Sequence, residues 1–155
     1  MIDDKTFLDI AKMIASKSHC RSHQVGAVAV IDGRIVATGI NGTLAGTPNC
    51  DDIFPVNDGT PGWRSVHHDW SNIAEVHAEQ NIIVLAAKYG IRLCDSVVYV
   101  TLEPCQNCLK LLAASGVRKV VYDKAYDFGA DESIEYVTKY GMEVIQGETD
   151  EMPTN

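Results

Sequence analysis

Three side chains that bind zinc well lie in two short segments of the chain. The first segment is His77-Ala78-Glu79, and the second, Pro104-Cys105-Gln106-Asn107-Cys108, carries two thiols. One imidazole and two thiolates fill three corners of a tetrahedral zinc site, whereas a structural site fills all four with protein. An open fourth corner is typical of a catalytic zinc that binds water. Glu79 beside it is a carboxylate that could carry that water's proton.

The segment that contains His77 has the pattern of a helix start. Asn72 and Glu75 have the spacing of a capping box, which marks the N-terminus of a helix. Residues at helical spacing then predict one continuous helical face. That face comprises Ile73, Val76, Gln80, Ile83, Val84 and Ala87. We therefore expect His77 near the N-terminus of this helix.

The two cysteines are expected at the start of a second helix. Pro104 suits the first turn of a helix that runs to Ser115, and Cys105 and Cys108 then lie on one face of it. The positive end of the helix favours their thiolate forms. A Cys-x-x-Cys pair alone also occurs in closed zinc sites and in redox pairs, but a closed site needs a fourth ligand close by. The sequence therefore predicts two helix N-termini that face each other across a catalytic zinc ion.

Hydrophobic periodicity predicts the elements that must position these residues. We expect further helices over residues 3–18 and 131–140, and strands over 25–31, 34–40, 96–101, 119–122 and 142–145. Asp32-Gly33 between the first two strands is the strongest short signal for a hairpin. A hairpin followed by alternating helices and strands predicts an α/β domain with a mixed five-stranded sheet and helices on both faces.

Two regions lack this periodicity. Residues 41–71 are rich in Asn, Gly, Pro and Asp and predict a long loop, which in a small domain is usually functional or an insertion. Residues 147–155 form an acidic, polar tail that we expect to fray. The whole of 1–155 is expected to form one domain.

Composition excludes several classes of protein. The net charge of −8 and the pI near 4.9 disfavour a polynucleotide partner. No apolar run approaches the ~20 residues of a membrane span, and the first residues do not read as a signal peptide. Five cysteines, two of them in a Cys-x-x-Cys pair, favour metal binding or catalysis over disulfides. We therefore expect a cytoplasmic protein. Cys94 is expected to be a buried core thiol.

With these motifs in view, the chain resembles the deoxycytidylate (dCMP) deaminase family, particularly its phage-type members, over about residues 7–145. His-x-Glu followed by Pro-Cys-x-x-Cys is the signature of zinc-dependent nucleobase deaminases. The matching segments are 20–27, 39–43, 49–52, 77–81, 101–105 and 116–122. The resemblance implies a three-layer α/β/α cytidine-deaminase-like fold. It also implies zinc-dependent hydrolysis of dCMP to dUMP and ammonia, which supplies dUMP for thymidylate synthesis, in the host-cell cytoplasm if the protein is phage-encoded.

The same resemblance implies a set of substrate contacts. Asn41 would contact the deoxyribose, and the backbone at Ala78 and Leu102 would read the edge of the pyrimidine ring. Candidates around the 5′-phosphate are Arg21, Ser22 and Tyr126. Arginine suits bidentate phosphate binding, although a solvated loop arginine is an alternative. Asn41 equally suits a turn before a glycine.

Regulation and assembly are further implications of the resemblance. Members of the family are typically homohexamers that are activated by dCTP with Mg²⁺ and inhibited by dTTP. Candidates for the regulatory nucleotide site are Gly42, Thr43, Gly46 and Asn49. Glycine-rich loops can present backbone N–H groups to a triphosphate. The same residues could instead form turns that bind no ligand.

A second, structural zinc is a further expectation from the resemblance. Phage-type relatives often bind it through two cysteines and two histidines, and Cys20, Cys50 and His67 match three of these positions. Trp63 stands where the family has its other histidine. Substitutes for that ligand are His19, His23 and His68. Otherwise Cys20 and Cys50 are buried thiols and packing alone holds the loop.

Two other functions remain open. One is another deaminase of the same fold, acting on free nucleosides, riboflavin intermediates or tRNA adenosine. The acidic charge argues against tRNA, and the loop at Asn41 argues against the others. The second is a zinc-bound interaction module without turnover, in which Glu79 could be replaced at no cost.

Overall fold

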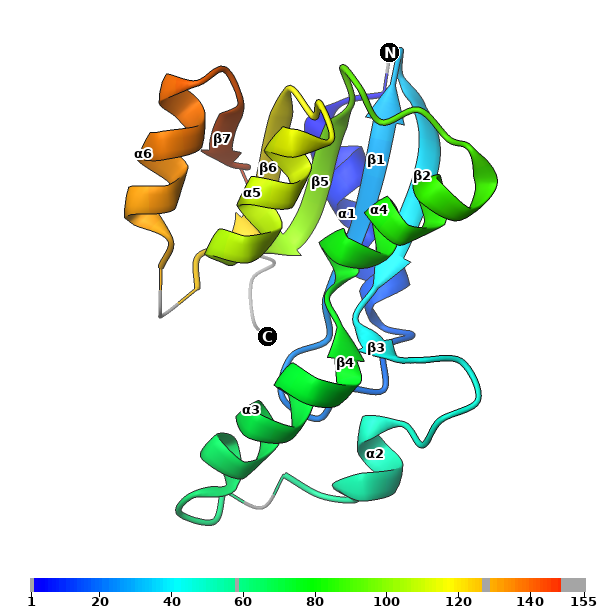
Figure 1. The fold of residues 1–155 in the computed structure, drawn as a ribbon, viewed down its shortest axis with the longest axis vertical. Helices are drawn as coiled ribbons and strands as arrows, with labels where there is room; N and C mark the ends of the chain where they lie inside the picture. The colour runs from blue at the N-terminus through cyan, green and yellow to red at the C-terminus, as the bar shows by residue number, and fades with distance from the viewer. Residues whose placement is uncertain (1, 58, 127–128, 149–155) are drawn as a thin grey trace, which may run out of the picture.

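A five-stranded sheet in the order β2-β1-β5-β6-β7 forms the centre of the molecule (Figure 1). The structure is a computed structural model, and it describes residues 2–57, 59–126 and 129–148. The strands are β1 (Gly26–Ile31), β2 (Arg34–Ile40), β5 (Val97–Leu102), β6 (Lys119–Lys124) and β7 (Glu143–Gln146). β1 pairs antiparallel with β2 and β5, whereas β5, β6 and β7 run parallel. The prediction of a mixed five-stranded sheet is confirmed.

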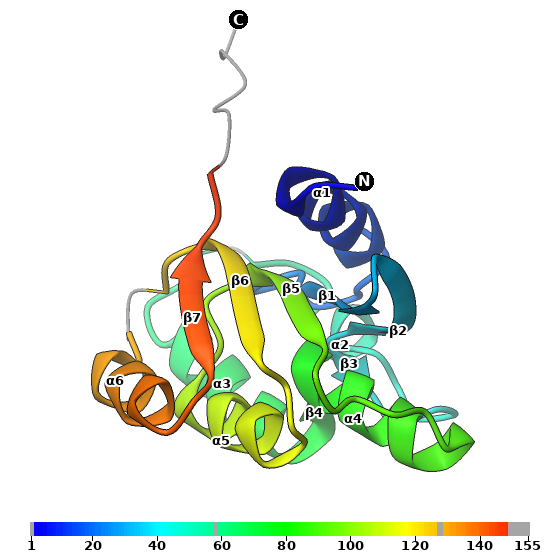
Figure 2. The same cartoon turned by 90° about the horizontal axis from the view of Figure 1, so that it is seen from above.

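Helices cover both faces of this sheet, as the periodicity predicts (Figure 2). α1 (Asp4–Ala15) lies on one face, and α4 (Ala78–Tyr89), α5 (Gln106–Ala114) and α6 (Asp131–Lys139) lie on the other. Because side chains alternate along a strand, Val120 packs toward α4 and α5 while Val121 packs toward α1. Leu109 on α5 is fully buried. The two apolar layers fix the helices that carry the predicted zinc ligands.

Glycines allow the closest contacts between the sheet and its helices. A Cβ atom at Gly39 in β2 would overlap the carbonyl oxygen of Ala78 at the start of α4. A Cβ atom at Gly26 in β1 would overlap the carbonyl oxygen of Ala11 in α1. The hairpin turn at Asp32 and Gly33 has positive φ at both residues, 49° and 73°, as a two-residue Asp-Gly turn requires.

Two expectations about the region before α4 are wrong. Residues 41–71 contain β3 (Gly42–Thr43), α2 (Cys50–Ile53) and most of α3 (Trp63–Ala74) in place of a long irregular loop. Trp63, Val66, Trp70 and Ile73 have helical spacing in the sequence, but among the residues of α3 only His67 is buried. The α3 side chains instead surround His67 with aromatic rings: Trp63 stacks on it at 4.9 Å between ring centroids.

The helix that follows also begins later than predicted. Asn72 lies in α3, and Glu75 lies in β4 (Glu75–Val76), so these two residues do not form a capping box. α4 instead begins at Ala78 with His77 as its N-cap, and Gln80 Oε1 accepts the backbone N–H of His77 at 2.9 Å. The predicted place of His77 at the start of this helix is confirmed.

The remaining differences are small. Cys94 is exposed in the turn before β5, so its expected burial in the core is wrong. Asp95, the next residue, has a φ of 68°, which turns the chain at the surface before the strand enters the sheet. Of the tail 147–155, residues 149–155 lie outside the described residues. None of the helices in the described part of the chain has the length and apolar character of a membrane span.

Candidate active site and second metal centre

The first cluster of metal-binding side chains joins the starts of α4 and α5. His77 is the N-cap of α4, Cys105 is the N-cap of α5, and Cys108 lies in the first turn of α5. His77 Nδ1 lies 3.7 Å from Cys105 Sγ and 3.4 Å from Cys108 Sγ. In a tetrahedral zinc site a nitrogen and a sulfur ligand are about 3.6 Å apart, given Zn–N near 2.05 Å and Zn–S near 2.3 Å. The donor set and its spacing therefore fit a zinc ion.

The helix that carries the thiols begins one step later than the sequence suggests. Pro104 precedes the N-cap instead of occupying the first turn, because Cys105 itself is the N-cap. The extended backbone of Cys105, with φ −67° and ψ 164°, places its sulfur beside the first turn of α5. The two helix N-termini face each other, as the sequence predicts.

The charges in this cluster are strongly coupled. The hydrogen bond from the Cys108 thiol lowers the pKa of Cys105 to about 4, and the same hydrogen bond raises the pKa of Cys108. The hydrogen bond to Cys105 also raises the pKa of His77. The three side chains therefore share protons through hydrogen bonds among themselves. A metal ion replaces these protons, since thiolate sulfur and neutral imidazole are the ligand forms.

Glu79 lies beside this cluster in the first turn of α4. It is 4% exposed, and burial raises its pKa. A buried carboxyl with a raised pKa next to a metal site is suited to accept a proton and release it again near neutral pH.

The predicted contacts of the sugar and phosphate come from segments that the structure brings together. Asn41, after β2, is buried; its Oδ1 accepts the Ser18 hydroxyl at 2.7 Å and the Val25 N–H at 2.9 Å. Its Nδ2 donates to the carbonyl of His23 at 2.7 Å. Asn41 thus orders residues 18–25, the segment that carries the candidate phosphate contacts Arg21 and Ser22.

The third phosphate candidate reaches the same segment from the end of β6. The ring of Tyr126, just after β6, lies edge-on to the ring of His23, with centroids 5.8 Å apart. Ala78 is buried at the first position of α4, and Leu102 is half-buried at the end of β5. Their predicted contacts with a pyrimidine ring stay predictions.

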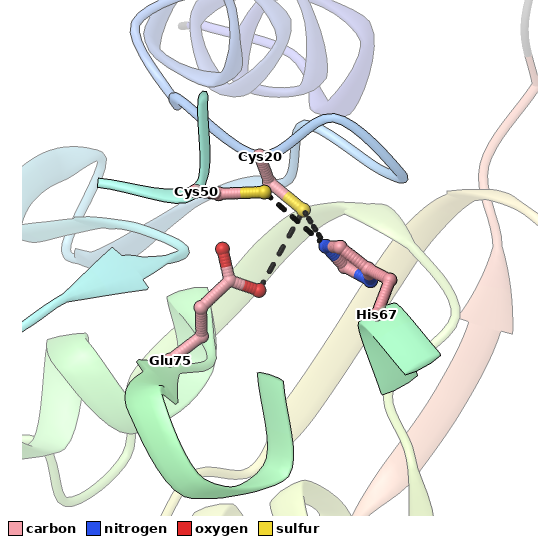
Figure 3. A group of neighbouring side chains, drawn as sticks. All are labelled: Cys20, Cys50, His67 and Glu75. Carbon is pink, nitrogen blue, oxygen red and sulfur yellow. Dashed lines mark hydrogen bonds between the residues drawn. The ribbon is translucent and has the colours of Figure 1, made fainter. Parts of the chain in front are cut away.

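A second cluster of metal-binding side chains joins the segment after α1 to α2, α3 and β4 (Figure 3). Cys20 and Cys50 are the thiols, and His67 is the imidazole. His67 Nε2 lies 3.7 Å from Cys20 Sγ and 3.2 Å from Cys50 Sγ. The fourth group is Glu75, whose Oε2 lies 3.6 Å from Cys20 Sγ. These distances again match the spacing of about 3.6 Å between ligands of a tetrahedral zinc.

Glu75 is the residue that sequence reasoning missed. The histidines considered for the fourth position are engaged elsewhere: His19 Nδ1 lies 2.9 Å from an oxygen of Asp51, and His68 Nε2 lies 3.1 Å from Asn72 Nδ2. Figure 3 shows the Glu75 carboxylate facing the two thiols. No local sequence pattern marks Glu75 as a ligand, because the other three members of its cluster come from distant segments.

The buried polar groups of the second cluster lack the partners that would stabilise their charged forms. Burial raises the pKa of Cys20 to about 12, raises the pKa values of Cys50 and Glu75, and lowers the pKa of His67. Within the described residues, Glu75 Oε1 is buried without a hydrogen-bond partner. A divalent cation would stabilise the thiolate and carboxylate forms of these ligands, and it would give the buried oxygen of Glu75 a partner.

A cavity of about 150 Å³ lies between the second cluster and the end of β2. It is lined by His19, Ile40, Asn41, Gly42, Thr43, Asn49, Cys50, Glu75 and Asn81. Three of the four candidate regulatory residues, all but Gly46, therefore share one cavity with Asn41. A larger hollow, about 360 Å³, lies over Phe54 and Trp63 and is lined by no titratable or metal-binding side chain.

The sequence matches a known family over most of its length. The family described as "Cytidine and deoxycytidylate deaminase zinc-binding region" matches residues 1–124. The deoxycytidylate deaminase of Enterobacteria phage T2 is 34% identical, over 90% of this chain and 89% of its own length. That of Mycobacterium phage D29 is 38% identical, over 78% of this chain and 94% of its own length.

The fold matches solved structures of the same kind. The dCMP deaminase of the cyanophage S-TIM5, in a crystal structure with dCMP and dUMP, is 32% identical and superposes with a TM-score of 0.73. The match covers 91% of this chain and 93% of the cyanophage chain. The predicted α/β/α deaminase-like fold is thereby confirmed.

Proposed function

Since the chain belongs to the cytidine and deoxycytidylate deaminase family, we propose that it hydrolyses dCMP to dUMP and ammonia. The observation that carries this proposal is the cluster of His77, Cys105 and Cys108 with the buried carboxyl of Glu79 beside it. Support for the nucleotide comes from the cyanophage relative, whose structure holds dCMP and dUMP.

The chain's own residues would perform the proton transfers of this reaction. Zinc, when bound by His77, Cys105 and Cys108, supplies the positive charge that lets water ionise near neutral pH. Glu79 would take one proton from that water and pass it to the ring nitrogen next to the amino-bearing carbon. It would then move the second proton, from the oxygen newly added to that carbon, to the amino group, which leaves as ammonia. Burial favours this role, because it raises the pKa of Glu79 so that the carboxyl can both hold and release a proton.

Replacement of Glu79 by glutamine tests the mechanism. Glu79→Gln keeps the size and position of the side chain but cannot carry a proton, so we expect full zinc content and a turnover lowered by about 10²–10⁴-fold. Glu143→Gln, at an exposed position in β7, is the matched control and should retain normal turnover. Near-normal turnover in a zinc-replete Glu79→Gln preparation would refute the assigned role.

Ammonia release from dCMP, deoxycytidine and CMP, measured side by side, tests the substrate. Selective turnover of dCMP is expected. If zinc-loaded protein released no ammonia from any of the three, the substrate would be another aminated ring, or the protein would be a binding module without turnover. The proposed contacts are those named from the sequence: Asn41 for deoxyribose, the backbone at Ala78 and Leu102 for the ring, and Arg21, Ser22 and Tyr126 for the 5′-phosphate.

We further propose that dCTP with Mg²⁺ activates the enzyme and that dTTP inhibits it. The cavity that Gly42, Thr43 and Asn49 share with Asn41 supports a nucleotide site next to the substrate. Unchanged dCTP activation curves in variants of these three residues would count against this site. Gly46, the fourth candidate, lies outside the lining of that cavity. Assembly as a homohexamer, supply of dUMP for thymidylate synthesis and a cytoplasmic location stay predictions.

A second zinc ion per chain is also proposed, with Cys20, Cys50, His67 and Glu75 as its ligands. Support comes from the four converging donor atoms and from the unpaired buried oxygen of Glu75. Metal analysis of purified protein should give two zinc ions per chain, and a value of one would end the proposal. A structural role is expected for this site, because all four positions are filled by protein.

A further inference from the structure

Glu103 is a buried carboxylate that neither metal cluster uses. It lies between the end of β5 and Cys105, and it is 7% exposed. Its Oε2 accepts the backbone N–H of Tyr126 at 3.0 Å, and its Oε1 accepts the backbone N–H of Ala130 at 3.2 Å. Its own N–H donates to the carbonyl of Lys124 at 2.8 Å. The residue before Pro104 is thus bound to both ends of the connection between β6 and α6.

These contacts explain why a charge is buried here. A carboxylate that is removed from water needs partners, and backbone N–H groups that donate to it form charge-assisted hydrogen bonds. Both partners of Glu103 flank the same connection, so the carboxylate ties Tyr126 and Ala130 to the end of β5.

The connection held by Glu103 carries a side chain that reaches the substrate region. The ring of Tyr126 meets the ring of His23 at 83°, with centroids 5.8 Å apart. The carbonyl of His23 is in turn held by the side chain of Asn41. Neither Tyr126 nor His23 lies in a helix or a strand, and the hydrogen bonds of Glu103 and Asn41 hold the backbone next to both rings.

We propose that Glu103 is a positioning residue that holds Tyr126 against His23 and thereby sets the preference for a 5′-phosphorylated substrate. The inference rests on the proposed function, in which Tyr126 lies at the phosphate. Glu103 acts through the backbone N–H of Tyr126 and does not touch the substrate. Its loss therefore weakens binding of the phosphate end more than it slows the chemistry at Glu79.

Steady-state kinetics with dCMP and deoxycytidine test this role. Glu103→Gln keeps the volume but places an NH₂ group opposite one of the two N–H donors. Losing one charge-assisted hydrogen bond corresponds to about a tenfold effect. We expect KM for dCMP to rise about tenfold, while kcat and the KM for deoxycytidine change by less than about threefold. An equal rise of KM for both substrates would overturn the proposal.

A double-mutant cycle separates positioning from a general loss of structure. If Glu103 acts through Tyr126, Glu103→Gln has little further effect on KM for dCMP once Tyr126→Ala is present, because residues that act together are not additive. Additive effects would overturn the proposal. Asp123→Asn is the matched control: Asp123 is also a buried carboxylate near a strand end, but it pairs with Lys12 at 3.3 Å. It should lower stability without changing the preference for dCMP over deoxycytidine.

Amide hydrogen exchange gives a measurement that does not need turnover. In Glu103→Gln the backbone amides of Tyr126 and Ala130 should exchange faster than in the parent protein. The amides of β5 should exchange at the same rate in both proteins. Unchanged protection of both amides would refute the positioning role. Should Glu103→Gln fail to fold, Glu103→Asp, whose shorter side chain keeps the charge, takes its place with the same expected result. Failure of the unchanged protein to deaminate dCMP would refute the proposed function and with it the phosphate preference.

Discussion

Gly39 lies where β2 crosses the start of α4, the helix whose N-cap is the zinc-binding candidate His77. A Cβ atom at this position would overlap the carbonyl oxygen of Ala78 and lie 3.1 Å from the backbone nitrogen of Ile82. Both obstacles are backbone atoms, so no side chain can rotate away. Gly39→Ala must therefore move the first turn of α4, which carries Glu79, away from the sheet.

The size of the effect follows from this geometry. Restoring an ordinary contact requires a displacement of about 1 Å, and overpacking of this kind costs about 1–3 kcal/mol. In a domain of this size, about 2 kcal/mol lowers the melting temperature by about 4–8 °C. A misplacement of about 1 Å at catalytic groups can cost about 10² in rate. We therefore expect a modest loss of stability and a large loss of kcat.

Gly26→Ala is the matched control, because it creates the same kind of overlap on the opposite face of the sheet. Its Cβ would overlap the carbonyl oxygen of Ala11 and lie 2.7 Å from the backbone nitrogen of Ala15, both in α1. Thermal unfolding, kcat for dCMP and zinc affinity by competition with a chelator are measured for both variants. Similar melting temperatures are expected, with zinc affinity and kcat lowered only in Gly39→Ala.

Three results would refute this reasoning. If Gly39→Ala retained normal kcat while its melting temperature fell, the start of α4 would not be the rigid support of the zinc site. If both variants lost kcat equally, the loss would reflect general destabilisation. A melting temperature unchanged in Gly39→Ala would mean that β2 and α4 are farther apart than the structure shows.

Three further changes have defined outcomes. Glu75→Ala should lower the zinc content from two ions to one per chain and spare the site at His77, which metal analysis with and without chelator would show. Asp3→Ala removes an N-cap whose pKa is lowered by its hydrogen bond with Thr6. The decrease in melting temperature caused by Asp3→Ala should be largest near pH 7, where Asp3 is ionised. It should become smaller as the pH falls through the lowered pKa of Asp3. Leu109→Ala, in the core, should cost about 2–5 kcal/mol of unfolding free energy in denaturant titration.

The sheet and most helices were predictable because their signals are local. The Asp32-Gly33 turn fixes the hairpin, and runs of β-branched and aromatic residues such as 97–100 mark strands buried on both faces. α3 has helical spacing at Trp63, Val66, Trp70 and Ile73, but the Asn, Gly, Pro and Asp residues before it favour a loop. Its buried residue is His67, which stacks on Trp63, so its packing differs from that of an aliphatic core.

The first metal cluster was predictable from the sequence for a similar reason. His77, Cys105 and Cys108 each belong to a short motif whose spacing already places the donor atom at a helix start. The pKa shift of Glu79 was not predictable, because it depends on burial by segments that are distant in the sequence. The same is true of Asn41, whose amide is occupied by Ser18, Val25 and His23 in contacts that no local pattern encodes.

Glu75 shows most clearly what a linear pattern leaves out. Its position as a candidate ligand depends on β4, a strand of only two residues in which Thr43 pairs with Glu75. No periodicity exists over two residues, so the sequence offered a capping box there instead. The pairing has a physical consequence, because β3 follows Asn41 directly and β4 directly precedes His77. The backbone that carries Glu75 is therefore joined to the zinc-binding candidate His77 by the chain itself, and to the segment after Asn41 by its pairing with β3.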